Sequence, residues 1–208
     1  MTETPRPEPS MLRCQLPEMD IDGLRVSRFT VEPDALENLR LMMAGRYCKP
    51  GEYTKLVVDG TLWMSDTTAE QWDHWPALVA ASNFPGGRGL VHGLGLGCIV
   101  SGFLNYLDHV DVVEKDPRVA EHIGGWFAAT YPGRVTIHVG DAYEFTFPKG
   151  TEWDVAWHDI WADVSEDDLP LMAKMNRRYA RRTKWQGCWA QKDLQRSRDR
   201  ERRSGWRW

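Results

Sequence analysis

Three glycines alternate with leucines in "HGLGLGC", residues 92–98, between two apolar runs. Glycine either adopts backbone angles that other residues avoid or lets another group approach the main chain closely. Gly93, Gly95 and Gly97 therefore predict a turn built around a ligand. In the dinucleotide-binding pattern G-x-G-x-x-G, the third glycine would fall on Cys98. The observed order, G-x-G-x-G, favours a ligand without phosphates over a dinucleotide.

Acidic residues stand at the ends of the next three strand-like runs. Glu114 lies 21 residues beyond Gly93, a separation typical of an acid that accepts hydrogen bonds from ribose hydroxyls. We expect Asp141 to receive the exocyclic amine of an adenine and Asp159 to point into the same crevice. Each acid alone could simply cap a helix. As a set with the glycines, they predict a site for a ligand with an amino-acid part and a nucleoside part.

The segments around these residues alternate between strand-like and helix-like patterns. Strands are expected at 89–92, 110–116, 134–141, 153–159 and 184–191. Helices are expected at 98–107, after Asp116 and Pro117, and from Ser165 to about residue 183. This alternation predicts parallel strands joined by crossovers, hence a Rossmann-like, doubly wound α/β fold with a mostly parallel sheet. Such sheets bind ligands beyond the carboxyl ends of their strands, where the glycines and acids lie.

The composition divides the chain into four regions. They are a disordered, proline-rich leader at 1–20, a hairpin and helical region at 21–87, the ligand-binding α/β domain at 88–195 and a basic tail at 196–208. The chain ends soon after the fifth strand of the α/β domain, so we expect a truncated C-terminal end of the fold. A second copy of the chain would cover the open sheet edge, which favours a homodimer.

The region before the glycines contains a strong turn signal. Asp59 and Gly60 interrupt an apolar stretch at 54–64, a pattern typical of a β-hairpin. A further strand is expected at 24–31. Helices are expected at 34–44, after Asp34, and at 67–81, where Pro76 must bend or divide the helix.

Charge is distributed unevenly along the chain. The net charge of −4 combines an acidic body with a C-terminal segment, residues 174–208, that holds 13 Lys and Arg against 3 Asp and Glu. Arginines interleaved with Trp206 and Trp208 can neutralise phosphates and stack on bases. A solvated, disordered segment is the simpler interpretation, so nucleic-acid binding through the basic tail stays an alternative.

Several function classes lack their sequence signals. No apolar run approaches the ~18 residues of a membrane-spanning helix. The cysteines at positions 14, 48, 98 and 188 form no C-x-x-C pair, which favours a reducing, cytoplasmic setting over disulfides. His92, His109, His122, His138 and His158 are scattered without the spacing of a metal site. No bound metal is expected.

Four stretches carry a resemblance to a known family. In their order along the chain, "VHGLGLG", "VVEKDP", "VGDAYEF" and "WDVAWHD" resemble class I S-adenosylmethionine-dependent methyltransferases over about residues 88–191. Within that fold the chain is most like the spermidine synthases, which are polyamine aminopropyltransferases. The stretch "LVVDGTLWMSDTTAEQWDHWPALV" resembles the part of those enzymes that precedes the glycine turn.

The resemblance implies S-adenosylmethionine as cofactor and a role for each matched residue. The three glycines would line its methionine part, Glu114 would bind the ribose, and Lys115 beside it would belong to the same site. Asp141 and Ala142 would hold the adenine. Asp159 would be both a cofactor contact and the catalytic aspartate.

Three departures from the spermidine-synthase pattern bear on the chemistry. Trp63 replaces a cofactor-contacting glutamine, Trp72 and Asp73 replace a Tyr-His pair, and Ala162 stands where a second catalytic aspartate would be. We therefore predict a methyltransferase with an unknown acceptor. The alternatives are a polyamine aminopropyltransferase and a protein that binds S-adenosylmethionine or nucleic acid without catalysis.

Overall fold

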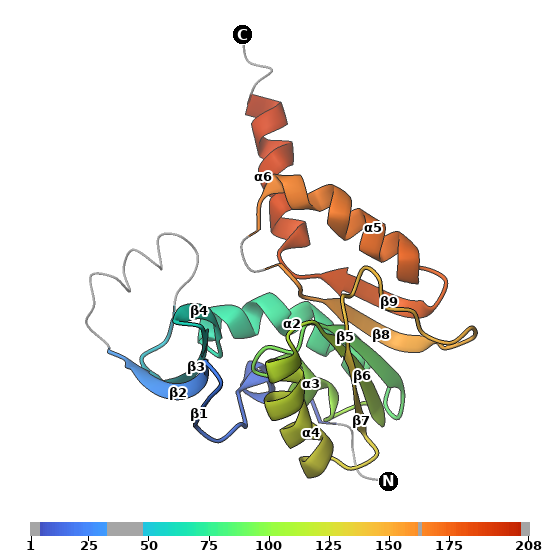
Figure 1. The fold of residues 1–208 in the computed structure, drawn as a ribbon. Helices are drawn as coiled ribbons and strands as arrows, with labels where there is room; N and C mark the ends of the chain where they lie inside the picture. Colours follow the sequence, from blue (N-terminus) through green and yellow to red (C-terminus); the bar gives the residue numbers. More distant parts are fainter. Residues whose placement is uncertain (1–4, 33–47, 162–163, 205–208) are drawn as a thin grey trace.

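The computed structural model describes residues 5–32, 48–161 and 164–204, which build two sheets and the helices around them (Figure 1). An antiparallel sheet in the order β1-β2-β3-β4 comes first along the chain. Its strands are β1 (Met19–Ile21), β2 (Leu24–Val31), β3 (Gly51–Val58) and β4 (Thr61–Ser65). The second sheet contains β5 (Arg88–His92), β6 (His109–Glu114), β7 (Val135–Val139), β8 (Trp153–His158) and β9 (Thr183–Cys188).

The second sheet is parallel throughout and has the order β7-β6-β5-β8-β9. Numbered along the chain, this is the 3-2-1-4-5 order of a doubly wound sheet, in which ligands bind where the order reverses. That place lies between β5 and β8, at their carboxyl ends. The predicted Rossmann-like α/β fold is therefore confirmed.

Helices cover both faces of the parallel sheet. The first face is covered by α2 (Thr68–Ser82), α3 (Cys98–Phe103) and α4 (Gly125–Thr130), which continues a π-helical segment, η2 (Val119–Gly124). The second is covered by α5 (Leu169–Tyr179), which follows a 3₁₀ turn, η3 (Glu166–Asp168). Side chains alternate along a strand, so Val91 lies in the first core and its neighbour Leu90 in the second, with Tyr179 of α5.

The predicted hairpin turn is present between β3 and β4. Asp59 and Gly60 have φ angles of 50° and 81°, and two successive positive φ angles are those of the type I′ turn that two-residue hairpins favour. Arg118, beside η2, donates hydrogen bonds to both Asp59 and Asp116. This pairing ties the antiparallel sheet to the parallel one.

The predicted disordered leader is wrong for the part of residues 1–20 that the structure describes. A 3₁₀ turn, η1 (Pro9–Leu12), is followed by an extended segment. Leu12 and Leu16 are fully buried, and Cys14 between them is 8% exposed. Apolar residues at every second position are the signal of an extended segment with one buried side, and the proline content concealed it.

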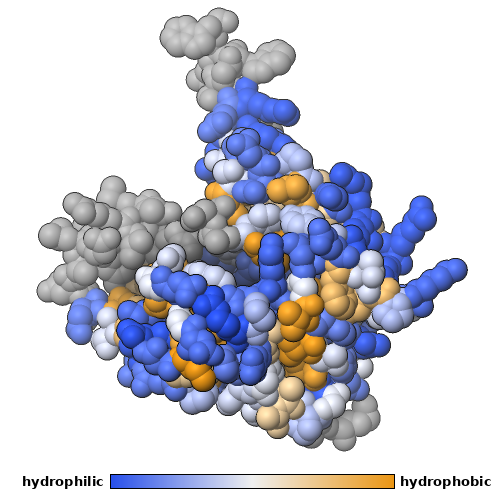
Figure 2. Space-filling view, in the orientation of Figure 1, coloured by the Kyte–Doolittle hydropathy of each residue, from blue (hydrophilic) through white to orange (hydrophobic). Residues whose placement is uncertain are grey.

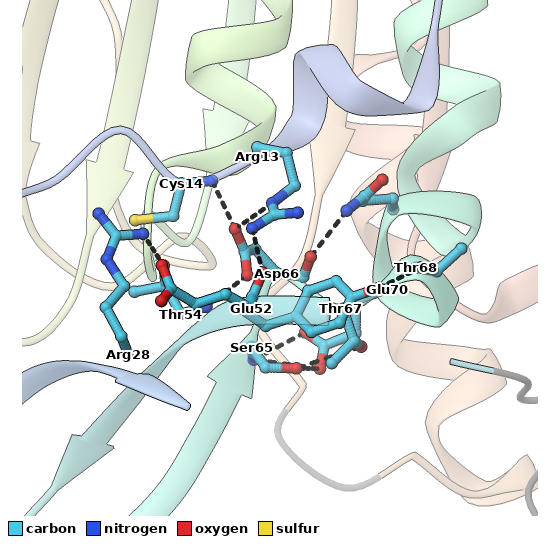
Figure 3. Close-up of polar contacts among 12 residues, drawn as sticks. Arg13, Cys14, Arg28, Glu52, Thr54, Ser65, Asp66, Thr67, Thr68 and Glu70 are labelled. Carbon is cyan, nitrogen blue, oxygen red and sulfur yellow. Dashed lines mark hydrogen bonds and ion pairs between the residues drawn. The ribbon is translucent and has the colours of Figure 1, made fainter. Parts of the chain in front are cut away.

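A buried carboxylate holds this N-terminal segment against the hairpin. Asp66 follows β4 and accepts hydrogen bonds from Arg13 Nε at 2.8 Å and from the main-chain N–H of Cys14 at 2.9 Å (Figure 3). It also accepts one from the main-chain N–H of Thr54 at 2.6 Å. Because these partners saturate the buried charge, the segment is anchored by polar contacts as well as by packing.

Other boundaries differ from the prediction in smaller ways. Pro76 lies inside α2, which runs on continuously, and α3 ends at Phe103 rather than at residue 107. The helix expected at 34–44 and the position of Ala162 lie outside the described residues.

The basic tail at 196–208, expected to be disordered, is helical as far as the structure describes it. Residues 196–204 belong to α6 (Gln191–Ser204), which projects from the rest of the molecule (Figure 1). Leu194 packs near Met172 of α5, and Arg196 pairs with Asp193 one turn before it. This apolar anchor lies just ahead of the tail, so tail residues continue a helix that begins against the body. None of the helices in the described ranges has the length and apolarity needed to cross a membrane.

Candidate functional site

A cavity of about 780 Å³ opens at the carboxyl ends of the parallel strands. Seven of the eight residues predicted to form the site line this cavity, and they come from four strand ends. They are Gly93 and Gly95 after β5, Glu114 and Lys115 at the end of β6, Asp141 and Ala142 after β7, and Asp159 after β8. Pockets for small ligands and cofactors span roughly 300–1,000 Å³, so a cofactor-sized ligand can enter.

Two glycines of the turn are required by neighbouring parts of the chain itself. Gly93 and Gly95 have φ angles of 84° and 50°, in the region that favours glycine. A Cβ at Gly93 would collide with the main-chain carbonyl of Asp159, and one at Gly95 with the sulfur of Met64. The groups that approach this backbone are therefore β4 and the end of β8, in addition to any ligand.

The third glycine does not line the cavity, contrary to the prediction. Gly97 precedes α3 as its N-cap residue with a φ of 70°, and a Cβ there would enter the ring of Phe127 on α4. It serves the packing of α3 against α4. The alternating spacing of the three glycines concealed that the last one belongs to the helix.

Glu114, at the end of β6, holds the glycine turn by a hydrogen bond. Its Oε2 accepts a hydrogen bond from the main-chain N–H of Leu94 at 2.7 Å, and its Oε1 accepts one from the main-chain N–H of Asp116 at 2.8 Å. The residue is 7% exposed. A carboxylate offers about four lone-pair positions, so each oxygen can accept a further hydrogen bond from a ligand in the cavity.

Asp141 and Lys115 form an ion pair at the rim. Lys115 Nζ lies 2.9 Å from Asp141 Oδ2, and the main-chain N–H of Tyr143 donates to Asp141 Oδ1 at 2.8 Å. The hydrogen bond from Lys115, with that from Tyr143, lowers the pKa of Asp141, and the same pairing raises the pKa of Lys115. Because the lysine side chain is 77% exposed, the pair contributes little to stability. Asp141 is therefore ionised and the lysine can swing aside for a ligand.

Asp159 lies deeper, at the point where the strand order reverses. Its main-chain N–H donates to the carbonyl of His92 at 2.9 Å, which continues the pairing of β8 with β5. Burial, together with the nearby carboxylates of Glu70, Asp73 and Glu114, raises the pKa of Asp159 to about 7. The group can therefore take up and release a proton near neutral pH.

The residues that cover the cavity from outside the parallel sheet were not predicted from the sequence. Met64 of β4, Glu70 and His74 of α2, and Trp189 after β9 all line it. His74 Nε2 lies 3.8 Å from Asp159 Oδ2. Glu70 and His74 are four residues apart on α2 and so share one helix face, a spacing that could have been recognised in "EQWDHW".

Other histidines and tryptophans near the ends of these strands mostly serve packing. His158 is fully buried and stacked on His92, as the alternation of side chains on β8 leads one to expect. Trp153 and Trp157 are buried in the two cores, whereas Trp161 lines the cavity. In the part of the chain that the structure describes, no group of three or more His, Cys, Asp or Glu could hold a metal ion.

No family model matches the chain. Over 65 residues, or 31% of its length, the chain is 38% identical to ribosomal RNA small subunit methyltransferase A of Nitrosomonas europaea. The matched stretch is 24% of that protein, so the chain spans about a quarter of the length of this relative.

Solved structures of methyltransferases are similar to part of the chain. The dimethyladenosine transferase of Plasmodium falciparum is 21% identical; the match covers 48% of this chain and 34% of that protein, with a TM-score of 0.38. Protein arginine methyltransferase 10 of Arabidopsis thaliana is 18% identical; the match covers 51% of this chain and 32% of that protein, with a TM-score of 0.40. An S-adenosylmethionine-dependent methyltransferase of Mesorhizobium loti is 20% identical; the match covers 53% of this chain and 48% of that protein, with a TM-score of 0.38. The fold assignment itself rests on the strand order of the parallel sheet, which is that of a doubly wound α/β sheet.

Proposed function

We propose that this chain is an S-adenosylmethionine-dependent methyltransferase whose cofactor lies in the cavity. The observation that carries the proposal is the convergence of Gly93, Glu114, Asp141 and Asp159 from four strand ends on one cavity. A relative that is 38% identical over 65 residues is a methyltransferase by name. S-adenosylmethionine is the cofactor, and the acceptor is a separate question.

The residues of the cavity fit this cofactor. Its sulfonium and ammonium groups are cationic, and Glu70, Glu114 and Asp159 present carboxyl groups to the cavity. Val113 and Ile160 supply apolar surface for the purine ring. We assign the methionine part to the glycine turn, the ribose hydroxyls to Glu114, and the adenine to Asp141 and Ala142.

Asp159 is the residue we assign to the chemistry. When bound, the cofactor supplies a methyl group on a positively charged sulfur, which a nucleophile can attack in line. The Asp159 carboxylate holds the N–H or O–H of the acceptor and takes its proton as the new bond to carbon forms. A base whose pKa is about 7 is half ionised at neutral pH, where general acid–base catalysis works best.

Within this fold, we further propose that the protein is spermidine-synthase-like. This proposal is supported by the β3–β4 hairpin and α2, which precede the glycine turn and bring Trp63, Met64 and His74 to the cavity. Aminopropyl transfer, the alternative reaction, is also an attack on carbon beside a sulfonium. We favour methyl transfer because Trp63 occupies the place of a polar cofactor contact in that family.

A nucleic acid is the macromolecular partner that the charge distribution favours. Residues 169–204 hold 12 Lys and Arg against 3 Asp and Glu, and hydrophilic side chains cover the projecting helix α6 (Figure 2). This helix begins two residues after Trp189, which lines the cavity. A polyanion that lies along α6 would therefore pass the cavity, and the basic side chains of α6 would neutralise its phosphates. The name of the N. europaea relative also refers to RNA.

A calorimetric titration tests the proposal directly. S-adenosylmethionine, its decarboxylated form and NAD are compared as ligands of the full chain. We expect binding of S-adenosylmethionine and no binding of NAD. Tight binding of NAD alone would contradict the proposal, and a clear preference for the decarboxylated form would favour aminopropyl transfer.

Two further expectations remain predictions. β7 and β9 are the edge strands of the parallel sheet, and a homodimer that covers one of them would sediment at twice the mass of the chain. The four cysteines are free and buried, which fits the predicted cytoplasmic setting.

A further inference from the structure

His74 reaches the catalytic end of the cavity from a different element than the residues it meets there. It lies on α2, and its side chain is 5% exposed. One edge of its ring faces Trp157, with ring centroids 6.0 Å apart and planes at 82°. The other side approaches Asp159, whose Oδ2 lies 3.8 Å from His74 Nε2. The imidazole is therefore fixed between the core and the carboxyl group that the proposed function uses.

The two ring nitrogens of His74 have different surroundings. Nδ1 is buried and has no hydrogen-bond partner among the described residues, whereas Nε2 faces Asp159. A neutral imidazole carries a proton on one nitrogen and a lone pair on the other. Buried N–H groups without a partner are rarer than buried acceptors without one. The proton therefore belongs on Nε2, where it points toward Asp159.

We propose that His74 is a positioning residue that donates its Nε2–H to the Asp159 carboxylate and so orients this group as the proton acceptor for the incoming nucleophile. The inference rests on the proposed function and assigns a supporting role within the same site. When the nucleophile loses its proton, that proton passes to a carboxylate oxygen of Asp159, and His74 stays neutral throughout. The separation of 3.8 Å is longer than a hydrogen bond, as is common for catalytic pairs before the ligands are bound.

The charged groups around the pair explain why such a donor is needed. Glu70 and Asp73 on α2 and Glu114 on β6 all raise the pKa of Asp159, after burial itself. Burial raises the pKa of the Cys188 thiol on β9, and the negative charge of Asp159 adds to this rise. Among the basic side chains of the described residues, His74 is the one with a nitrogen within 4 Å of the Asp159 carboxyl. It opposes the carboxylates and keeps the ionised form of Asp159 accessible.

Burial keeps His74 itself neutral. Desolvation lowers its pKa to about 4, so the ring carries no charge over the range in which Asp159 titrates. A neutral donor can orient a carboxylate without locking it into an ion pair. The simpler alternative is that His74 only fills space against Trp157, and it makes a different prediction for the titration of Asp159.

The test is a carbon-13 NMR titration of the full chain with labelled aspartate, in which Asp159→Asn identifies the Asp159 signal. His74→Gln places an amide nitrogen near the position of Nε2, whereas His74→Asn, the matched control, places it near Nδ1. We expect the Asp159 midpoint to rise by about one unit or more in His74→Asn and to stay near the parent value in His74→Gln. Equal midpoints in all three proteins, or equal shifts in both variants, would overturn the proposal.

A second measurement needs no variant and covers the case in which one fails to fold. Nitrogen-15 NMR of the parent with labelled histidine reports which ring nitrogen of His74 carries the proton, and the opposite tautomer would also overturn the proposal. Calorimetry with S-adenosylhomocysteine tests the proposed function separately from the role of His74. If the parent does not bind it, the proposed function fails, while the titration still decides whether His74 and Asp159 form a pair.

Discussion

The Glu114 carboxylate accepts a hydrogen bond from the main-chain N–H of Leu94 at 2.7 Å, in the middle of the glycine turn. The predicted ribose-binding acid is therefore also the group that holds the turn against the end of β6. With the proposed ribose contact, ligand binding and the shape of the site depend on the same side chain.

Replacing Glu114 should weaken cofactor binding strongly. Glu114→Ala removes the carboxylate that we assign to the ribose hydroxyls and leaves the N–H of Leu94 without its partner. We expect a loss of about 2–3 kcal/mol, or roughly 30- to 150-fold in the dissociation constant of S-adenosylmethionine measured by calorimetry. Arg25→Ala is the control, since Arg25 pairs with Asp20 on the surface and does not line the cavity. Parental affinity in Glu114→Ala would disprove the ribose assignment.

The glycine turn offers a second prediction, on stability. Gly93→Ala places a Cβ against the rigid main-chain carbonyl of Asp159, whereas Gly95→Ala meets the flexible side chain of Met64. We expect Gly95→Ala to cost about 1–3 kcal/mol in the free energy of unfolding and Gly93→Ala to cost more.

Two variants control for the backbone angle and for the contact. Gly60 has a φ of 81°, close to that of Gly93, but a Cβ there meets nothing within 4 Å. Gly60→Ala should therefore cost only the conformational penalty, about 1–2 kcal/mol. Adding Met64→Ala to Gly95→Ala should recover part of the loss in urea titrations. No recovery would show that Met64 is not the obstacle.

The parallel-sheet half of the molecule was largely predictable from the sequence, for a physical reason. The local alternation of strands and helices specifies the fold, and parallel strands bring their carboxyl ends to one edge. Gly93, Glu114, Asp141 and Asp159 could thus be assigned to one site without knowledge of any contact. Gly97 could not be separated from them, because its partner, Phe127, is 30 residues further along the chain.

The contacts that cover the site come from elements that the sequence does not place relative to the sheet. His74 lies on a helix whose packing against β8 is a tertiary result, so its meeting with Asp159 has no local signal. The anchoring of residues 12–16 by Asp66 likewise joins positions about fifty residues apart. Composition alone predicted disorder in this segment, but contacts with distant residues hold it in place.

Buried histidines should make the protein sensitive to acid. Burial lowers the pKa of His74 and of His158 to about 4, and that of His92 is also lowered. Between about pH 6.5 and 4 the unfolded chain therefore binds more protons than the native one at these positions, so stability falls as the pH falls. Asp159 acts in the opposite direction, because its raised pKa makes the native state bind the extra proton between its ordinary value and about 7.

On acidification, three histidines favour the unfolded state and one aspartate favours the native state. The free energy of unfolding should therefore decrease from pH 6.5 to pH 4.5 in urea titrations. His158→Gln should flatten this dependence, and Asp159→Asn should steepen it. A stability that is constant over this range, or that increases on acidification, would contradict the assignment of these groups.

The outer part of α6 should be separable from the fold. Cutting the chain after Gln195 retains Leu194, which packs near Met172, and removes mostly exposed residues. We expect the melting temperature and the affinity for S-adenosylmethionine to stay nearly unchanged. If the helix binds nucleic acid, the parent should bind RNA or DNA with an affinity that falls steeply with salt, and the shortened chain should lose this binding.

A charge variant separates the role of the arginines from that of the helix itself. The full chain with Arg196, Arg200 and Arg202 replaced by Gln keeps the length of α6 but lowers its positive charge. Its binding should be weaker and less dependent on salt than that of the parent. Equal retention of all three proteins on a nucleic-acid column would dismiss this surface as a partner site.

Asp159 provides the prediction on catalysis. Asp159→Asn keeps the shape of the side chain but cannot take a proton from the acceptor. Transfer to the true acceptor should fall by about 100-fold or more, in line with usual general acid–base contributions, while the affinity for S-adenosylmethionine changes far less. In the parent, the rate should rise with pH through about 7 as the carboxyl group ionises.

The acceptor assay with putrescine completes this test. The resemblance to spermidine synthases implies a second aspartate for the far ammonium of a diamine, and Ala162 stands at that place in this sequence. We therefore expect no spermidine from putrescine and decarboxylated S-adenosylmethionine in either the parent or Asp159→Asn. Measurable spermidine from the parent would replace the methyltransferase assignment with an aminopropyltransferase. Full transfer activity in Asp159→Asn would remove this residue from the mechanism, because methyl transfer would then proceed without a carboxylate at that position.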